Sequence, residues 1–262
     1  MGWVETKAAG LEVYQCRELN DHQIIQAFSG RQTGNLALHT GEDPKQVVNR
    51  RRLWLEALGL SLDRLVSGIQ VHGTNIAMIK ETDAGAGARE IDGAIRETDA
   101  LITKSAGVIL ATFTADCLPI FIYDPVTPAV AVVHAGWRGA LGGIAALTIK
   151  RMNQEYGTDP GNCRVGIGPS ICGDCFRVGP ELAERFGAIH PQTVFRDETA
   201  SKVDLQAFIR LELQGMGVKP DHIYDSGLCT ACRPDRFFSY RAESGETGRM
   251  MGIISLKKRR SE

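Results

Sequence analysis

Runs of apolar residues between Gly, Pro, Asp or Ser predict the strands of this chain. The most marked stretch is residues 108–143, in which two strand-like runs end in reactive residues, one at Thr114-Ala115-Asp116-Cys117 and the other at His134. Shorter runs lie at residues 11–28, 65–71, 99–103, 164–167 and 223–226. Short runs bounded by turn residues are typical of buried strands. The last two strands, 237–241 and 249–256, are predicted to pair as a closing hairpin around residues 243–247.

Helices are predicted where apolar residues recur at helical spacing. Asp43 supplies an N-cap and Pro44 a first helical residue, and Gly59 ends this first helix. Further helices are predicted at residues 140–156, 180–186 and 205–216. Residues 83–96 are small and polar without periodicity, which indicates a long exposed loop.

The order of these elements favours an α+β fold. Strands and helices do not alternate regularly, as a doubly wound parallel sheet would require. No Pro/Ser-rich linker or internal repeat divides the chain. We therefore expect one domain over residues 1–262, in which residues 256–262 form a solvated basic tail.

The composition of the chain excludes some classes of function. A formal net charge of −1 argues against a general binder of nucleic acid or of membrane surfaces. No apolar run approaches the roughly 20 residues that span a bilayer, and the first residues lack the apolar core of a signal peptide. The seven cysteines are an odd number in a chain without an export signal. Reduced thiols in a cytoplasmic protein, with metal-binding or catalytic roles, are expected.

His72, Cys117 and His134 are the candidate reactive side chains. Each lies at or just past the end of a strand-like run, so the three converge if their strands share a sheet. Two imidazoles and one thiolate suit Zn²⁺, and a fourth position left to water is typical of catalytic zinc. Two other interpretations stay open on spacing alone. Cys117 could be a nucleophile with His134 as its base and Asp116 as the orienting group, or a buried structural residue.

Two Cys-x-x-Cys pairs, Cys172/Cys175 and Cys229/Cys232, also need an explanation. Such pairs can build a structural zinc site with four thiolates. Residues 176–228 separate the pairs, however, which is a much longer gap than the usual spacing. Thiols that line a loop, or a redox-sensitive pair, explain the pattern equally well.

Arginines and one polar turn are candidates for binding an anionic ligand. Arg50 lies in the first predicted helix, Arg138 lies four residues after His134, and Arg241 ends Phe237-Phe-Ser-Tyr-Arg241. A guanidinium can bind phosphate or carboxylate, or form an ion pair that fixes a loop. The turn at residues 29–35, which ends at Asn35, could place backbone amides around a ligand or be a plain surface loop.

These motifs together resemble the YfiH family. The shared motifs, in order, are Gln70-Val-His72-Gly, Thr114-Ala-Asp-Cys117-Leu-Pro, His134-Ala-Gly-Trp-Arg-Gly139, Gly168-Pro169, Cys229-Thr, Phe238-Ser-Tyr-Arg241 and Thr247-Gly-Arg-Met250. The 29–35 turn and the 43–52 helix also look like that family, so the resemblance covers nearly the whole chain. Members are labelled multicopper polyphenol oxidase (laccase-like), purine nucleoside phosphorylase and peptidoglycan editing factor. The chain departs from the family where it has Cys172-Gly-Asp-Cys175-Phe176 in place of Gly-Pro-Cys-Cys-Tyr.

The resemblance implies a fold and a site. The fold is a single α+β domain with α/β/β/α layers and mixed sheets, shared with a cysteine-hydrolase-like toxin domain. The implied zinc ligands are His72, Cys117 and His134. The implied substrates are small molecules, purine nucleosides with phosphate: phosphorolysis of adenosine, inosine, guanosine or methylthioadenosine, and deamination of adenosine.

This implied chemistry assigns roles to the remaining residues. In deamination, zinc-activated water would attack C6 of the purine, and Asp116 would carry a proton. In phosphorolysis, Arg50, Arg138 or Arg241 would hold phosphate near the ribose C1′. Asn35 would contact the substrate from the 29–35 turn.

The other family labels predict different chemistry. Laccase-like oxidation needs several copper ions, but the remaining histidines are few and form no His-x-His pair, so zinc is expected rather than copper. They are His22, His39, His190 and His222. The editing label implies a cytoplasmic amidase that removes a wrong amino acid from a muropeptide precursor, with zinc or with Cys117 as nucleophile. A zinc-stabilised binding module is the non-enzymatic alternative.

Overall fold

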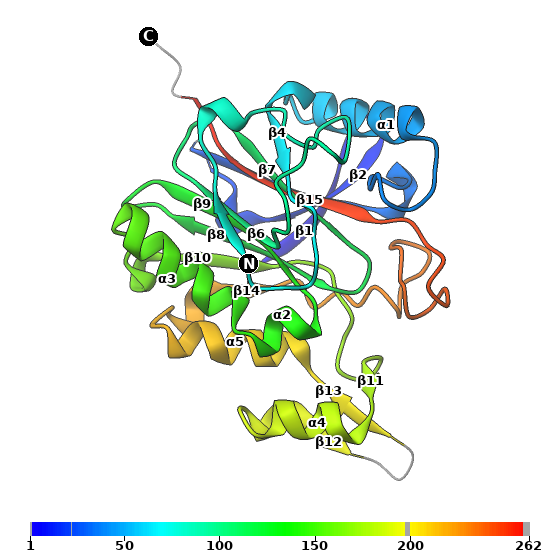
Figure 1. The fold of residues 1–262 in the computed structure, drawn as a ribbon, viewed down its shortest axis with the longest axis vertical. Helices are drawn as coiled ribbons and strands as arrows, with labels where there is room; N and C mark the ends of the chain where they lie inside the picture. Colours follow the sequence, from blue (N-terminus) through cyan, green and yellow to red (C-terminus); the bar gives the residue numbers. More distant parts are fainter. Residues whose placement is uncertain (1, 22, 197–199, 259–262) are drawn as a thin grey trace.

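The computed structural model describes residues 2–21, 23–196 and 200–258, which form two six-stranded sheets and a small three-stranded one (Figure 1). The first sheet has the order β1 (Trp3–Ala8), β2 (Leu11–Cys16), β3 (Ile24–Ser29), β15 (Met250–Leu256), β7 (Ile109–Thr114), β4 (Leu65–Ser67). The second has the order β14 (Ile223–Asp225), β10 (Arg164–Ile167), β8 (Leu118–Asp124), β9 (Ala129–Ala135), β6 (Ala100–Thr103), β5 (Ile76–Met78). The small sheet contains β11 (Arg177–Val178), β13 (Ser201–Val203) and β12 (Val194–Arg196). Both large sheets mix parallel and antiparallel pairs, as expected.

Helices cover the outer faces of the two large sheets. The helices are α1 (Pro44–Ala57), α2 (Trp137–Leu141), α3 (Ile144–Tyr156), α4 (Pro180–Gly187) and α5 (Leu205–Gly215). α1 packs on the first sheet, and α3 packs on β9 and β6 of the second, with α2 and α5 beside it (Figure 1). α4 packs on the small sheet. The predicted α+β fold with α/β/β/α layers is confirmed.

The alternation of side chains along β8 shows why the central strands are apolar throughout. Ile120 and Ile122 face the helices, whereas Phe121 and Tyr123 face the other large sheet. Every residue of β8 is buried, because both faces of the strand are covered. Burial of apolar surface contributes about 25 cal/mol per Å² to the stability of the fold. A strand such as β8 makes this contribution with both of its faces.

Local signals place two of the helices. The Asp43 carboxylate accepts a hydrogen bond from the backbone N–H of Lys45, and α1 begins at Pro44 as predicted. The helix predicted over 140–156 ends at Tyr156 as expected, but its predicted start is wrong, because the chain forms two helices, α2 and α3. Gly143 lies between them with a φ of 74°, a left-handed conformation that interrupts the helix.

The predicted closing hairpin is also wrong. β15 forms, but it pairs antiparallel with β3 and β7 and not with residues 237–241, which are irregular and end in a turn. Two partners from the middle of the sheet bury β15 completely, which a terminal hairpin would not achieve. β1 was not expected at all; three of its six residues are exposed and the other three are half-buried.

The C-terminal end departs from the expected tail. Leu256 is buried in β15, and the backbone N–H of Lys257 donates to the carbonyl of Gln23 at 2.6 Å. The predicted tail therefore does not include residues 256–257, and its residues 259–262 lie outside the described part of the chain. None of the described helices has the length and apolar character needed to cross a membrane.

Candidate functional site

Sheet topology brings His72, Cys117 and His134 to one edge between the two large sheets. β4 and β7 are parallel neighbours, so the chain leaves both strands at the same edge. His72 then lies on the passage from β4 to β5, and Cys117 on the passage from β7 to β8. His134 is in β9, opposite Pro119 of β8. One ligand atom from each of the three residues lies within 4.8 Å of the others. The convergence expected from the strand ends is thus present.

The Gln70 side chain continues the pairing of β4 with β7 almost to His72. Its amide nitrogen donates to the Phe113 carbonyl at 2.9 Å, and its amide oxygen accepts from the Phe113 N–H at 2.8 Å. An amide side chain can replace a peptide group in this way because it carries the same donor and acceptor. Gln70 therefore fixes the start of the turn that presents His72.

A buried carboxylate, Asp99, organises two of the three side chains. It accepts from the backbone N–H groups of Val71, His72 and Gly73 at 3.2, 3.0 and 2.8 Å. It also lies 2.8 Å from Nδ1 of His134, and its side chain is 0% exposed. These bonds hold His72 at a φ of 60°, and Nε2 is the nitrogen of His134 that is not bonded to Asp99. Carboxylates often orient metal-binding histidines in this way. Sequence reasoning missed Asp99, although Asp99 ends a polar turn just before β6.

Electrostatics favour an ionised Cys117. Burial alone raises the pKa of a thiol, but the charge and hydrogen bonds of His134 and His72 lower the pKa of Cys117 to about 6. Burial likewise lowers the pKa of an imidazole, but Cys117 and Asp99 raise the pKa of His134 to about 9. The lowered pKa of the thiol and the raised pKa of the imidazole both favour a thiolate–imidazolium pair. A thiolate and imidazole nitrogens within 4.8 Å of one another also fit a zinc ion.

Asp116 precedes Cys117 in a left-handed conformation, with a φ of 87°. Its carboxylate accepts from the hydroxyls of Thr230 and Ser239 at 2.6 and 2.7 Å and from the backbone N–H of Arg241 at 2.7 Å. Such strain persists only when the surroundings impose it. These three donors hold the backbone of Asp116 directly beside Cys117, and Asp116 also lies in the cavity wall.

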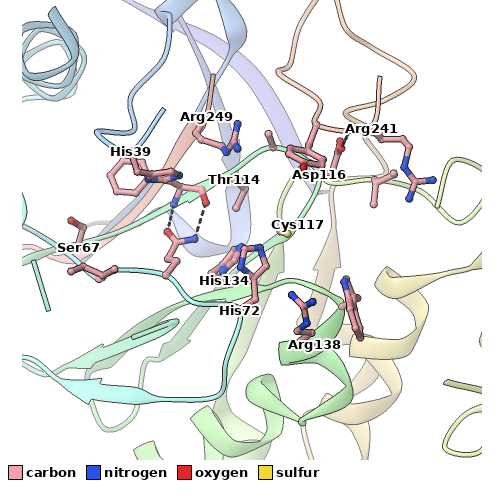
Figure 2. A pocket seen from close by; sticks show the side chains of 18 of the residues that line it. His39, Ser67, His72, Thr114, Asp116, Cys117, His134, Arg138, Arg241 and Arg249 are labelled. Atoms are coloured by element: carbon pink, nitrogen blue, oxygen red, sulfur yellow. Dashed lines mark hydrogen bonds between the residues drawn. The ribbon is translucent and has the colours of Figure 1, made fainter. Parts of the chain in front are cut away.

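The three side chains lie in the wall of a cavity of about 790 Å³ (Figure 2). Among the residues that line it, Asp116 is the sole carboxylate in the described part of the chain. Five arginines also line it: Arg51, Arg138, Arg177, Arg241 and Arg249. Within the described ranges, no ion pair joins any of these arginines to a carboxylate. The cavity therefore carries an excess of positive charge that favours an anionic ligand.

The arginines of α1 point to different places. Arg51 is 1% exposed and donates to the carbonyls of Leu36, Gly87 and Ala88. Burial lowers the pKa of Arg51 to about 9. Arg50, which the sequence suggested for substrate binding, instead pairs with Glu42 at 2.5 Å in a second pocket. The structure thus brings Arg51, and not Arg50, to the cavity with the histidines.

Asn35 lies with Arg50 in the second pocket. Its amide donates to the Ala37 carbonyl and to Thr40, and its oxygen accepts from the backbone N–H of Arg249 at 3.0 Å. The structure does not bring Asn35 to the histidine–cysteine group. Asn35 supports the cavity indirectly, because it anchors the backbone of Arg249.

Four of the five cavity arginines lie outside α1, and Figure 2 labels three of them: Arg138, Arg241 and Arg249. Arg138 lies on α2, with its guanidinium 4.6 Å from the ring of Trp137. Arg241 donates to the Cys175 carbonyl at 3.0 Å. Arg249 donates to the carbonyls of Thr247 and Gly248, and burial lowers its pKa. Arg138 and Arg241 were expected; the signal for Arg249 was its place in the Thr247–Met250 motif.

The remaining described histidines do not extend the group into a multicopper centre. His190 bonds to Glu212 at 3.0 Å, and His222 lies 3.1 Å from the Cys163 carbonyl. His39 lines the cavity but is not part of the group. His22 lies outside the described residues. Multicopper centres need many imidazoles, so the donor set fits a single zinc ion better.

The fold and the site together define an α/β/β/α protein with a candidate metal site in an arginine-lined cavity. Residues 26–257 match the family model described as "Multi-copper polyphenol oxidoreductase laccase", and the chain belongs to this family.

Known relatives support this assignment. The chain is 33% identical to "Purine nucleoside phosphorylase YlmD" of Bacillus subtilis (strain 168), over 91% of this chain and 90% of that protein. It is 36% identical to "Adenosine deaminase RL5" of an unknown prokaryotic organism, over 88% of each. The crystal structure of the Bacillus licheniformis hypothetical protein YfiH superposes with a TM-score of 0.90 at 30% identity, covering 94% of this chain and 96% of that one. The resemblance to the YfiH family is confirmed.

Proposed function

We propose that this chain is a zinc-dependent enzyme that acts on purine nucleosides, with phosphorolysis as its main reaction. The observation that carries the proposal is the cavity itself, in which five arginines and one carboxylate surround two histidines and a cysteine. The names of relatives as phosphorylases and as a deaminase are consistent with it. Phosphate is the anion that phosphorolysis requires.

The arginines would bind phosphate and stabilise charge. A guanidinium can donate two parallel hydrogen bonds to a phosphate, and it is weakly hydrated, so it suits a partly dry cavity. Arg138 and Arg249 have no carboxylate partner among the described residues, which leaves their charge available to a ligand. Fixed donors at the phosphate stabilise the charge that develops as the glycosidic bond breaks. The rings of Phe113, Phe176 and Tyr240 in the cavity wall offer surfaces on which a purine can stack.

His72, Cys117 and His134 would hold the zinc ion and leave a fourth position open towards the cavity. Zinc in such a site lowers the pKa of bound water to about 7, which is the chemistry that deamination at C6 needs. Asp99 keeps His134 in the orientation in which Nε2 faces the ligand position. Asp116 and its three donors keep Cys117 in place from the other side.

The test combines adenosine, inosine or guanosine with the purified protein, with and without phosphate, and separates the products by chromatography. Free purine base and ribose 1-phosphate that form only with phosphate support phosphorolysis; inosine formed from adenosine supports deamination. Arg138→Ala should raise the KM for phosphate at least about tenfold, because it removes a charge-assisted bond worth about 1.5–3 kcal/mol. Arg52→Ala, at an exposed arginine of α1 that lines neither pocket, is the matched control and should leave that KM unchanged. An equal effect of both variants would contradict this assignment of Arg138.

A second candidate function rests on a different observation. Cys117, His134 and Asp99 form a thiolate–imidazole–carboxylate series like that of cysteine hydrolases, and an amidase acting on a muropeptide precursor could use Cys117 as its nucleophile. Such an enzyme would keep its activity when metal is removed by a chelator and would lose it on alkylation of Cys117. Release of an amino acid from a muropeptide by metal-free protein would favour this function over phosphorolysis.

A further inference from the structure

The second cluster of cysteines lies outside the candidate site. The Sγ atoms of Cys172, Cys175, Cys229 and Cys232 all lie within 4.8 Å of one another. The separation of the two pairs in sequence made a joint site one interpretation among several. In the structure the four thiols meet.

Strand pairing explains why they meet. β10 and β14 are parallel neighbours, and their pairing continues past the strand ends. The Ser170 N–H donates to the Leu228 carbonyl, the Thr230 N–H donates to the Ser170 carbonyl, and Ser170 and Cys229 form an isolated bridge. Because parallel strands end at the same edge, both Cys-x-x-Cys turns leave the sheet side by side.

The geometry of the turns fits a metal ion. A tetrahedral zinc ion at about 2.3 Å from each thiolate places the sulfurs about 3.8 Å apart. The Cys175 and Cys232 sulfurs are 3.4 Å apart, and no two sulfurs of the cluster are more than 4.8 Å apart. The backbone N–H groups of Cys172 and Cys232 point at the Cys229 sulfur at 3.3 and 3.4 Å. Amide donors of this kind stabilise negative charge on a sulfur, so the turns are built for a thiolate.

We propose that Cys172, Cys175, Cys229 and Cys232 bind a structural zinc ion, distinct from the metal site in the cavity. Four protein thiolates fill the tetrahedral shell and leave no position for water or substrate, which is typical of structural zinc. The site is at the surface, with Cys232 exposed and Cys229 buried.

This ion would hold together the far wall of the cavity. The first Cys-x-x-Cys turn leads directly into Phe176 and Arg177, which line the cavity. The second contains Thr230, whose hydroxyl donates to Asp116 at 2.6 Å. Arg241 donates to the Cys175 carbonyl at 3.0 Å. Because Asp116 positions Cys117, a metal that ties the two turns together stabilises the cavity site without being part of it.

Zinc content measures the proposal directly, without any activity assay. Protein purified without a chelating tag, under reducing conditions, is dialysed against metal-free buffer and analysed by inductively coupled plasma and native mass spectrometry. The wild type should hold two zinc ions per chain, one for each group. Cys232→Ser and Cys117→Ala should each hold one. Cys163→Ser, which changes a buried cysteine outside both groups, should still hold two.

Loading with Co²⁺ provides a second measurement on the unaltered chain, which does not depend on how the variants fold. A tetrathiolate site gives intense sulfur-to-cobalt charge-transfer absorption that the histidine–cysteine group alone would give only weakly. The proposal would be overturned if the wild type held one zinc ion per chain and Cys232→Ser still held that ion. So would a disulfide within the cluster in protein kept reduced, found as missing thiols in a titration of the denatured chain. These outcomes are separate from failure of the proposed function, which concerns turnover.

Discussion

The chain holds two groups of side chains that could bind a metal ion, and the two groups differ in their surroundings. His72, Cys117 and His134 face a large cavity and depend on a buried carboxylate, Asp99, for their orientation. The four cysteines are not among the residues that line this cavity, and two backbone N–H groups donate to the sulfur of Cys229. Three mixed ligands leave a coordination position for chemistry, whereas four thiolates leave none.

Both groups arise from the same feature of the fold. In each, the ends of parallel neighbouring strands, β4 with β7 and β10 with β14, bring distant residues to one edge. The difference lies in the path of the chain beyond the strand ends. After β4 and β7 the chain crosses to the other large sheet and leaves a cavity between the crossings. After β10 and β14 it makes two short turns against each other.

We expect the largest difference in turnover when one thiolate is removed from the cavity group and, in a second variant, one from the four-cysteine group. Cys117→Ala should lower turnover at least about 1,000-fold, because it removes a ligand of the metal that the proposed chemistry uses. Cys175→Ser should reduce turnover much less, since its group does not touch the substrate. Measurements are kcat/KM for nucleoside phosphorolysis and zinc content. Full zinc content and full turnover in Cys117→Ala would falsify the role of this group.

A pair of glycines tests how closely the cavity group is packed. A Cβ added at Gly136 would lie 2.7 Å from Cδ2 of His72 and 3.2 Å from the Cys117 sulfur. Gly136→Ala must therefore displace a ligand, and a displacement of about 1 Å costs about 100-fold in rate. Gly179 is the matched control, because it too is a helix N-cap in extended conformation and a Cβ there meets nothing within 4 Å.

The comparison of the two alanine variants decides whether the effect is steric. Kinetics and zinc content are measured for both, with thermal unfolding as a check on folding. Gly179→Ala should match the wild type. If Gly136→Ala also matched the wild type, the two histidines and Cys117 could not be bound to a metal in this arrangement.

Asp99→Asn should weaken metal binding by the cavity group alone, because Asp99 orients only that group. The substitution keeps the shape of the side chain but removes the charge that accepts from His72, Gly73 and His134. Loss of such a partner lowers metal affinity about 10–100-fold. Titration with a competing chelator should show weaker binding of one zinc ion, and the zinc ion of the four-cysteine group should be unaffected. Equal weakening of both ions would instead indicate general destabilisation.

The smallest effect is expected from the segment that joins the two groups. Glu243 anchors residues 229–249 through an ion pair with Arg31 at 2.7 Å. The hydrogen bond from Arg31, together with the donors Thr247 and Ser239, outweighs the effect of burial and lowers the pKa of Glu243 to about 2. A carboxylate whose pKa is lowered by folding stabilises the protein above its unfolded pKa, near 4.5, and this contribution is lost as the pH falls from about 4.5 to about 2.

Glu243→Gln should therefore lower the free energy of unfolding at pH 7 by about 1–2 kcal/mol, after allowance for the partial exposure of Glu243. The free energy of unfolding of this variant should also fall less steeply than that of the wild type below about pH 4.5. Denaturant unfolding at several pH values measures both. Glu246→Gln, on the same segment but exposed, is the control. The same slope with pH in Glu243→Gln as in the wild type would show that another carboxylate is responsible.

The sequence predicted those parts of the fold and site that depend on short, strong patterns. Continuous apolar runs identified β7, β8 and β9, and capping residues identified α1, because these signals are local. The group formed by His72, Cys117 and His134 was foreseen from strand ends and from the family resemblance. The direction of Arg50 and Arg51 was not foreseen, because adjacent helical residues differ by about 100° in direction and only packing decides which one is buried.

Pairing between distant segments limited the rest. β15 reads as half of a hairpin until β3 and β7 are known to flank it. The two Cys-x-x-Cys pairs look unrelated until the parallel pairing of β10 with β14 is known. Asp99 could not be recognised from the sequence, because its four partners are three consecutive residues of one turn and His134 of β9. In each case the sequence did not reveal which distant segments lie next to each other.

The central claim is that the group formed by His72, Cys117 and His134 makes this chain a zinc-dependent phosphorylase of purine nucleosides. The direct measurement is phosphate-dependent release of purine base from inosine by the wild type, before chelation, after chelation, and after zinc is restored. The account predicts that activity is lost with the zinc ion of the cavity and returns with it, and that Cys117→Ala cannot be rescued. Undiminished base release from protein shown to be free of zinc, or no base release from fully loaded protein, would contradict it.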